Sequence, residues 1–153
     1  MSQPTTFTSS TPRFGIPLLF AGQAQKEFFV NQAHAMMDFL AHPVVEGELV
    51  DPPADPADGR AWIVAEGATG DWSGYDNAIG YRAAEAWIFV MPVESMTVLD
   101  RAEGRNVRWS DGSWAGSGHV SQPDGGSVID LEARGAIDGI LAALEHHGIL
   151  PAN

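Results

Sequence analysis

The stretch Val107-Arg-Trp-Ser-Asp-Gly-Ser-Trp114 indicates the fold, because it contains a β-prone segment, a turn and the start of a second strand. Its Asp111-Gly112 pair is typical of two-residue hairpin turns, which need positive φ angles. Upstream, Ile79-Gly-Tyr-Arg-Ala-Ala-Glu-Ala-Trp87 repeats the arrangement of a strand, a polar turn and a Trp that opens the next strand. These two copies predict an antiparallel sheet made of hairpins.

Similar short segments, separated by turn residues, fill the chain from Arg60 to Gly116. The predicted strands cover residues 61–65, 78–82, 87–91, 97–100, 106–109 and 114–116. Before them, residues 51–59 are rich in Pro and Gly and predict a rigid connection. We therefore expect one small antiparallel, Trp-rich sheet.

Helical spacing of apolar residues predicts one helix on each side of the sheet. The first covers residues 23–41 and is apolar on most sides, so we expect it to be buried, within the chain or between subunits. The second covers about residues 129–147, with Ser127 as its N-cap and Gly148 at its end. The predicted fold class is α+β.

Composition predicts four regions along the chain. They are a flexible N-terminal arm at 1–12, the helix and sheet domain at 13–116, a Gly/Ser-rich linker at 117–127 and a detached amphipathic helix at 128–153. The apolar stripe of this last helix spans only about two heptads, too few for an isolated coiled coil. It therefore needs a partner surface, on its own sheet or on a second copy. The stripe consists of Ala133, Ile137, Ile140, Leu141 and Leu144.

Charge and composition exclude several classes of function. The net charge of −12 would repel a phosphate backbone, so nucleic acid is not an expected partner. The chain has no Cys, and therefore no disulfide, thiolate metal site or thiol nucleophile. No apolar run has the length of a membrane span or a signal peptide, which predicts a protein made in the cytoplasm without a membrane partner.

Motifs for catalysis or metal binding are also missing from the sequence. Asp51, Asp55 and Asp58 lack the spacing of a calcium loop, and the His residues lack that of a zinc site. No Ser has the context of a nucleophile, and no Gly-rich segment has the Lys of a phosphate loop. We expect no enzyme activity, no catalytic residues, no metal and no cofactor, and we place envelope polysaccharide hydrolysis last among the alternatives.

Five Trp residues lie between Trp62 and Trp114, and two interpretations remain open for them. Trp side chains in short strands usually fill a core, but flat aromatic faces on a sheet also stack on sugar rings. Trp72 lies in a polar turn and Tyr75 follows it. These two residues are our candidates for contact with host capsule polysaccharide.

Several motifs resemble a domain family of unknown biochemical activity found in prophages and in the gene transfer agents of alphaproteobacteria. They run in order along the chain: Thr11-Pro-Arg-Phe-Gly-Ile-Pro-Leu-Leu19, Ala21-Gly-Gln-Ala-Gln-Lys26 with Asn31, Pro53-Ala-Asp-Pro-Ala-Asp-Gly59, Gly67-Ala-Thr-Gly-Asp-Trp72 and Asp111-Gly-Ser-Trp114. The Gly-Gln-Ala-Gln-Lys element is the most specific of them.

The resemblance implies a virion component, similar to the head-spike and fibre proteins that help a particle meet its host. It implies assembly in the bacterial cytoplasm, release by lysis, and contact with a capsid vertex or fibre. Many members continue into longer fibre regions after the sheet, whereas this chain has one helix there, so we expect a spike base or fibre adaptor. We expect it to form a homo-oligomer, a trimer or a pentamer. The expected interface residues are Gln23, Gln25, Lys26, Asn31, Ile137, Ile140, Leu141 and Leu144.

Overall fold

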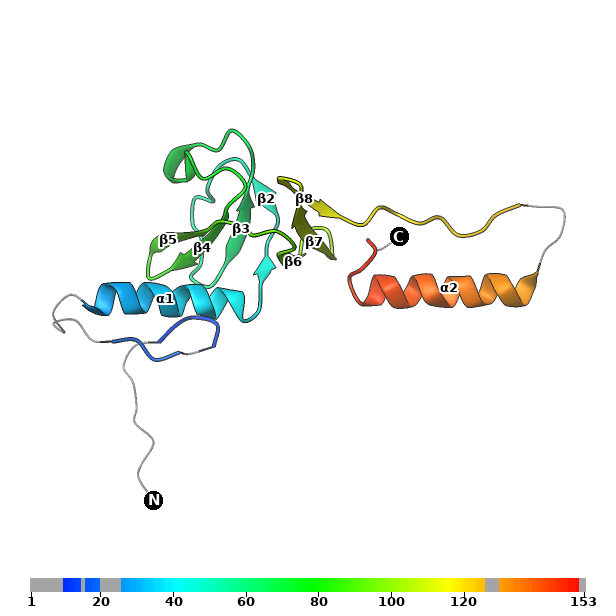
Figure 1. The fold of residues 1–153 in the computed structure, drawn as a ribbon, viewed down its shortest axis with the longest axis horizontal. Helices are drawn as coiled ribbons and strands as arrows, with labels where there is room; N and C mark the ends of the chain where they lie inside the picture. The colour runs from blue at the N-terminus through cyan, green and yellow to red at the C-terminus, as the bar shows by residue number, and fades with distance from the viewer. Residues whose placement is uncertain (1–9, 15, 20–25, 126–129, 152–153) are drawn as a thin grey trace, which may run out of the picture. The chain divides into compact units, whose positions relative to one another are not determined.

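The computed structural model describes residues 10–14, 16–19, 26–125 and 130–151, which divide into two compact units (Figure 1). Unit 1 covers residues up to Pro92, and unit 2 begins at Val93. Unit 1 contains α1 (Lys26–Leu40), β1 (Val44–Val45), β2 (Glu48–Leu49), β3 (Ala61–Val64), the 3-10 turn η1 (Gly70–Trp72), β4 (Ile79–Ala83) and β5 (Ala86–Val90). Unit 2 contains β6 (Thr97–Asp100), β7 (Arg105–Ser110), β8 (Ser113–Gly116) and α2 (Leu131–His146).

The sheet of unit 1 has the strand order β2-β3-β4-β5. β3, β4 and β5 pair antiparallel, whereas β2 pairs parallel to β3. The register places Trp62 opposite Gly80, and Gly80 opposite Phe89. Because side chains alternate along a strand, these three residues share one face of the sheet, while Tyr81 lies on the other.

The Tyr81 face packs against α1. The Phe39 ring lies 5.5 Å from the Tyr81 ring, and both side chains are fully buried. Ile63 and Ile79 share this face with Tyr81 and are buried as well. The core of unit 1 therefore lies between one side of α1 and the middle strands of the sheet.

The two predicted hairpins are both confirmed. Ala83 pairs with Ala86 across the turn Ala84-Glu85, whose φ angles are 50° and 59°. In unit 2, β7 and β8 enclose the turn Asp111-Gly112, with φ angles of 51° and 80°. Positive φ angles at both central residues define the type I′ turn, whose backbone twist matches the twist of the two strands that it joins.

Unit 2 consists of the antiparallel run β6-β7-β8 and of α2, whose C-terminal end is tied to the strands. The Asn106 amide donates to the Gly148 carbonyl at 2.6 Å, and the Ser117 hydroxyl donates to the Ile149 carbonyl. Leu141 and Leu150 are buried. The predicted helix is therefore attached to the strands at its end, whereas most of its length is exposed.

The α+β class is confirmed, and the predicted strands agree with the observed ones within two residues at each end. Two small sheets replace the single expected sheet, because the chain divides between Pro92 and Val93 rather than after residue 116. Asp130 is the N-cap of α2, accepting from the Ala133 amide at 2.8 Å. Ser127, the expected cap, lies outside the described residues.

Two further expectations need correction. Within unit 1, α1 buries only a narrow side of Ala35, Asp38 and Phe39 and leaves Phe28 and Phe29 about two thirds exposed or more, at 67% and 72%. The expected flexible arm also reaches into the fold, since Thr11 is buried. Thr11 is buried because the described part of the segment before α1 folds back onto the helix, where the Thr11 hydroxyl donates to Asp38.

Candidate functional site

An aromatic layer covers the sheet face opposite α1. Trp72 comes from η1 and contacts Trp62 and Trp87, with ring centroids 6.5 and 5.0 Å away. A Cβ atom at Gly80 would lie 3.5 Å from the Trp72 indole, so the ring lies directly on the backbone of β4. A side chain larger than a methyl group at position 80 would therefore collide with the Trp72 ring.

The loop that carries Trp72 is held by two carboxylates. Asp76 accepts from the Gly67 and Ala68 amides, both at 3.2 Å. Asp51 accepts from the Thr69 hydroxyl. These contacts fold residues 66–78 over the sheet and direct the Trp72 ring inward.

The expectation that Trp72 presents an open ring to a sugar is wrong, because its side chain is 0% exposed. Its indole N–H has no hydrogen-bond partner within the described part of the chain. Tyr75 is 41% exposed and stacks on Phe89 at 3.7 Å and 8°. Of the two candidates for sugar contact, only Tyr75 is accessible.

Asp38 is buried and connects several segments of unit 1, which we call the Asp38 hub. It was not among the site residues predicted from the sequence. Its carboxylate accepts from the Thr11 hydroxyl at 2.6 Å and the Tyr81 hydroxyl at 2.8 Å. It also accepts from the backbone amides of Arg13 and Phe14, at 2.9 and 2.8 Å. Asp38 therefore joins α1, β4 and the segment before α1.

These contacts shift two pKa values. Burial alone would raise the pKa of Asp38, but its hydrogen bonds with Thr11, Arg13, Phe14 and Tyr81 together hold that pKa below its ordinary value. Burial, followed by the hydrogen bond to the Asp38 carboxylate and its charge, raises the pKa of Tyr81. At neutral pH the site therefore pairs an ionised carboxylate with a neutral phenol.

Arg13 extends the hub across unit 1. Its guanidinium donates to the carbonyls of Gly59, His42 and Val44, at 2.8, 2.5 and 3.0 Å. It also lies 5.2 Å from the centre of the Phe39 ring. The Arg13 side chain therefore connects the end of α1, β1 and the turn before β3 through hydrogen bonds.

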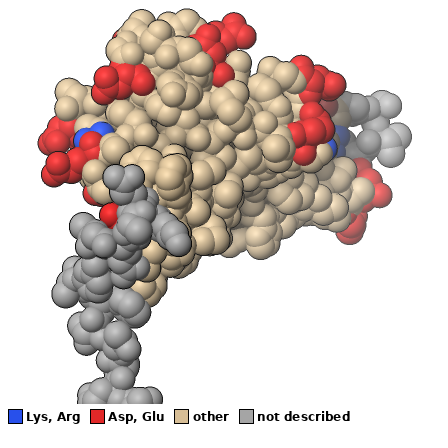
Figure 2. All heavy atoms as spheres, turned by 60° about the vertical axis from the view of Figure 1, so that its left-hand side comes forward, with Lys and Arg blue, Asp and Glu red and all other residues tan. Residues whose placement is uncertain are grey.

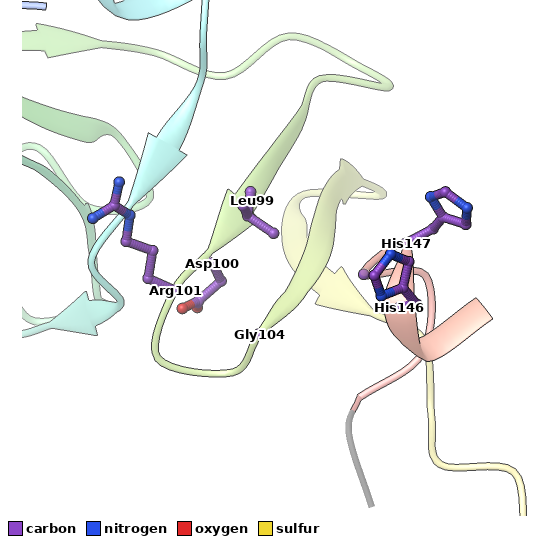
Figure 3. A pocket seen from close by; sticks show the side chains of 7 residues that line it. Leu99, Asp100, Arg101, Gly104, His146 and His147 are labelled. Atoms are coloured by element: carbon purple, nitrogen blue, oxygen red, sulfur yellow. The ribbon is translucent and has the colours of Figure 1, made fainter. Parts of the chain in front are cut away.

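A cavity of about 500 Å³ lies in unit 2 between the β6–β7 turn and the end of α2. Arg101, His146 and His147 line it, together with the buried Asp100. Figure 3 shows the Arg101 side chain pointing away from the two His rings, so these side chains do not converge on one point. Within the described ranges, no group of three or more His, Asp or Glu residues is arranged to hold a metal ion.

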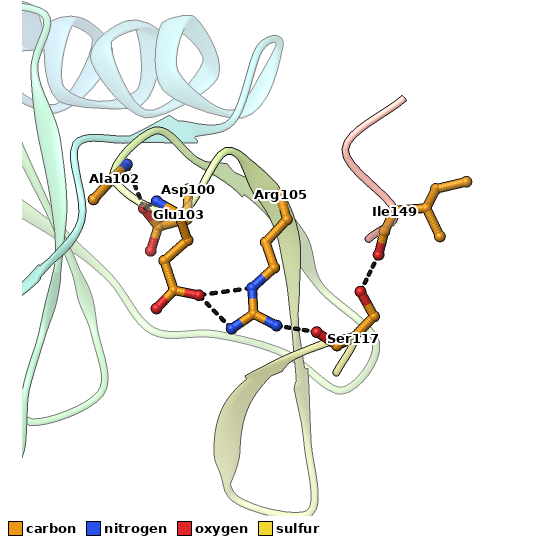
Figure 4. A network of polar contacts seen from close by, with 6 residues as sticks. All are labelled: Asp100, Ala102, Glu103, Arg105, Ser117 and Ile149. Atoms are coloured by element: carbon orange, nitrogen blue, oxygen red, sulfur yellow. Dashed lines mark hydrogen bonds and ion pairs between the residues drawn. The ribbon is translucent and has the colours of Figure 1, made fainter. Parts of the chain in front are cut away.

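The residues beside this cavity fasten the C-terminal turn after α2 to the strands (Figure 4). Arg105 donates to Glu103, with Nε 2.6 Å from Oε2, and to the Ser117 carbonyl. Ser117 in turn donates to the Ile149 carbonyl. A Cβ atom at Gly116 would lie 2.7 Å from the Arg105 guanidinium carbon, so a side chain at this position would displace the guanidinium.

The rest of α2 presents an exposed apolar stripe. Ile137 and Ile140 are 41% and 59% exposed, Ala133 is exposed, and Leu144 is half-buried. On the face shown in Figure 2, acidic side chains occur in several separate groups rather than as a continuous layer. The stripe itself contains no charged residue.

The family model for a "Protein of unknown function (DUF2793)" matches residues 30–115, more than half of the 153 residues. The chain belongs to the DUF2793 family. A comparison with curated proteins finds no match. The DUF2793 match includes most of α1 and every strand, and it ends before α2.

Within the DUF2793 segment, the motifs picked out from the sequence have structural roles. The motif at residues 67–72 supplies the loop and ring that cover the sheet, and the motif at 111–114 forms the β7–β8 hairpin. Gly59 has a φ of 85°, and a Cβ there would lie 3.3 Å from the Pro12 side chain. The motif that begins at Thr11 therefore packs against the one that ends at Gly59.

The expected interface residues differ in whether they are described, buried or exposed. Gln23 and Gln25 lie outside the described residues, and Lys26 is described only by its place at the start of α1. The Asn31 amide is used within the chain, accepting from the Leu19 amide at 2.8 Å and donating to the Leu19 carbonyl at 3.0 Å. In α2, Leu141 is buried, whereas Ile137, Ile140 and Leu144 form the stripe.

The sequence did contain a signal for the Asp38 hub. Asp38 is flanked by Met36, Met37, Phe39 and Leu40 in an otherwise apolar helix turn. A carboxylate in such surroundings is retained only where hydrogen bonds compensate its burial. Its partners could not be identified from this signal, because they are far away along the chain.

Proposed function

We propose that this DUF2793 protein is a non-catalytic structural subunit of a phage or gene transfer agent particle. It serves at the base of a head spike or as the adaptor that mounts a fibre, and it helps the particle attach to its host. Particle assembly takes place in the bacterial cytoplasm and lysis releases the product. The observation that carries this proposal is the exposed apolar surface of α1 and α2.

The size of that surface supports an assembly role. Phe28 and Phe29 are 67% and 72% exposed, and their rings contact each other at 5.6 Å. At about 150–250 Å² for each aromatic side chain, these two expose roughly 200–350 Å² of apolar surface. Monomeric proteins rarely expose contiguous apolar patches of more than a few hundred Å², so two adjacent exposed rings on one helix favour an interaction site.

The ionisable groups support a structural role as well. The buried carboxylate of Asp38 is used to hold Thr11, Tyr81 and two backbone amides in place. Asp100 is buried in the same way, accepting from the Ala102 amide at 2.8 Å. Both carboxylates have contacts that stabilise turns and layers, which is how a scaffold uses them. No described helix is long and apolar enough to cross a membrane.

The test is to purify particles from a producing culture by density gradient and to measure this chain by peptide mass spectrometry. We expect its peptides to co-sediment with the particles at a fixed ratio to the major capsid protein. Deleting its gene should yield particles that lack the spike or fibre and adsorb poorly to host cells. Recovery of the chain only in the soluble fraction would contradict the proposal.

A second candidate function is binding of host capsule polysaccharide, favoured by the accessible Tyr75 ring stacked on Phe89. Parallel stacking keeps the outer ring flat against the sheet, an orientation suited to contact with a sugar ring. Titration with purified capsule polysaccharide should shift the Tyr75 resonances in NMR spectra, and Tyr75→Ala should abolish binding. Tyr75→Phe, which keeps the ring, is the matched control. Unchanged spectra at saturating polysaccharide would remove this candidate.

A further inference from the structure

We propose that α2 pairs antiparallel with the α2 of a second copy of this chain. The inference rests on the proposed assembly role and names both the partner and its orientation. Its starting point is the spacing of the exposed stripe. Residues 133, 137, 140 and 144 follow one another at intervals of four, three and four, which is the spacing of the core positions of a coiled coil.

The sizes of the side chains favour the antiparallel arrangement. If Ile137 lies opposite Ile140 of the second copy, Ala133 lies opposite its Leu144 by the same register. Every layer then combines side chains that fill the space evenly, a small one with a large one or Ile with Ile. In a parallel pair, Ala133 would meet Ala133 and Leu144 would meet Leu144, leaving one layer underfilled and another crowded.

The helix dipoles favour the same orientation. Antiparallel pairing opposes the dipoles of the two copies of α2, whereas parallel pairing aligns them side by side. The first turn of α2 contains Glu132 and is capped by Asp130, so parallel pairing would also bring these carboxylates close to those of the second copy.

The structure holds α2 ready for this contact. Asp130 caps its start, and the hydrogen bonds of Gly148 and Ile149 fix its end to unit 2. Leu141 is buried beside the stripe, while Ile137 and Ile140 stay exposed. A helix fixed in this way loses little conformational entropy on binding, so a stripe of about two heptads, too short for a coiled coil of isolated helices, is long enough for this pair.

Cysteine cross-linking tests the orientation directly, because the native chain contains no Cys. Ala133 and Leu144 are eleven residues apart, about 16 Å along a helix, whereas a disulfide joins Cα atoms at most about 7 Å apart. Mixing the Ala133→Cys and Leu144→Cys proteins under mild oxidation should therefore give a disulfide-linked dimer that combines one chain of each. Each variant alone should give little dimer.

The matched control uses Gly135→Cys and Ala142→Cys, which lie on the side of α2 away from the stripe. Their mixture should not cross-link above background. Dimers of Ala133→Cys alone would show parallel pairing and overturn the proposal. Equal cross-linking of stripe and control pairs, or none of either, would overturn it as well.

Light scattering of the native full-length chain supplies a second measurement. We expect the native chain to be a dimer and Ile140→Asp to be a monomer. Ala142→Asp, on the opposite side of α2, should remain a dimer. Unchanged far-ultraviolet circular dichroism shows that the variants are folded. A monomer at high micromolar concentration would overturn the pairing. Detection of the chain in particles is independent of this result, so failure of the pairing and failure of the assembly role remain distinguishable.

Discussion

The hairpins β4–β5 and β7–β8 share one local design but differ in what surrounds them. Each has a two-residue turn with positive φ angles and a Trp near the start of its second strand. In unit 1, Trp87 meets the buried Trp72, and α1 covers the opposite face of the sheet. In unit 2, Trp109 and Trp114 meet each other at 5.5 Å, and both are only half-buried.

The difference shows that local sequence builds a hairpin but does not give it a core. Unit 1 buries Trp72, Tyr81 and Phe39 completely. The buried apolar side chains of unit 2, among its described residues, are Val98, Val107, Leu141 and Leu150. Unit 2 therefore has less apolar burial to offset its loss of conformational entropy, which is consistent with a unit that is completed by a partner.

Replacement of a Trp should separate the two units most clearly. We expect Trp72→Ala to destabilise unit 1 by about 3–5 kcal/mol, because it leaves a large cavity above Gly80. Trp114→Ala should cost unit 2 only about 1 kcal/mol, since that ring is half-exposed. Hydrogen exchange followed by mass spectrometry reports on each unit separately. Equal losses in the two units would show that their cores do not differ as described.

The Asp38 hub should make unit 1 sensitive to acid. Asp38→Asn should cost about 2–4 kcal/mol at neutral pH, because hydrogen bonds to a charged group contribute about 1.5–3 kcal/mol each. The pKa of Asp38 in the folded state lies below the unfolded value of about 3.9. The ionised carboxylate therefore stabilises the fold fully above pH of about 3.9, and this stabilisation is lost as the pH falls through the folded pKa.

Urea titrations between pH 7 and pH 2, monitored by hydrogen exchange, measure this effect. In Asp38→Asn, the stability of unit 1 should no longer fall as the pH passes through the folded pKa of Asp38. Asp58→Asn changes an exposed carboxylate and should behave like the native chain. An unchanged pH profile in Asp38→Asn would contradict the role given to Asp38.

The end of α2 should depend on Gly148. Its φ of 65° is left-handed, and such a conformation costs a residue with a side chain roughly 1–2 kcal/mol. Gly148→Ala should therefore loosen the contact with Asn106 and accelerate amide exchange in the last turn of α2. Gly139→Ala, within α2 and facing open space, should instead slow exchange, because Ala favours a helix over Gly. Faster exchange in both variants would argue against the specific role of Gly148.

The turns of the hairpins should give the smallest effects, with opposite signs. Glu85 has a φ of 59°, so Glu85→Gly should stabilise unit 1 by about 1 kcal/mol by removing backbone strain. Gly112 has a φ of 80° in the equivalent turn, so Gly112→Ala should destabilise unit 2 by about 1 kcal/mol. Thermal unfolding measures both. A destabilised Glu85→Gly would show that the Glu85 side chain contributes contacts that outweigh the strain.

Local features were predictable from the sequence because they depend on neighbouring residues. The Asp111-Gly112 turn, the strand spans and the end of α2 at Gly148 are set by turn preferences and by side-chain spacing. The exposed stripe of α2 was also foreseen, because its residues recur at helical intervals. The short strands β1 and β2 were missed, since two residues are too few to show any period.

The sequence by itself determined the α+β class, both hairpins and the amphipathic character of α2. Only the tertiary structure decided that Trp72 is buried rather than open to a ligand, and that Asp38 binds Thr11 and Tyr81. Those partners are 27 and 43 residues away from Asp38 along the chain. Contacts of that range depend on how sheet, helix and loop pack together, and packing is a property of the whole unit that no local pattern encodes.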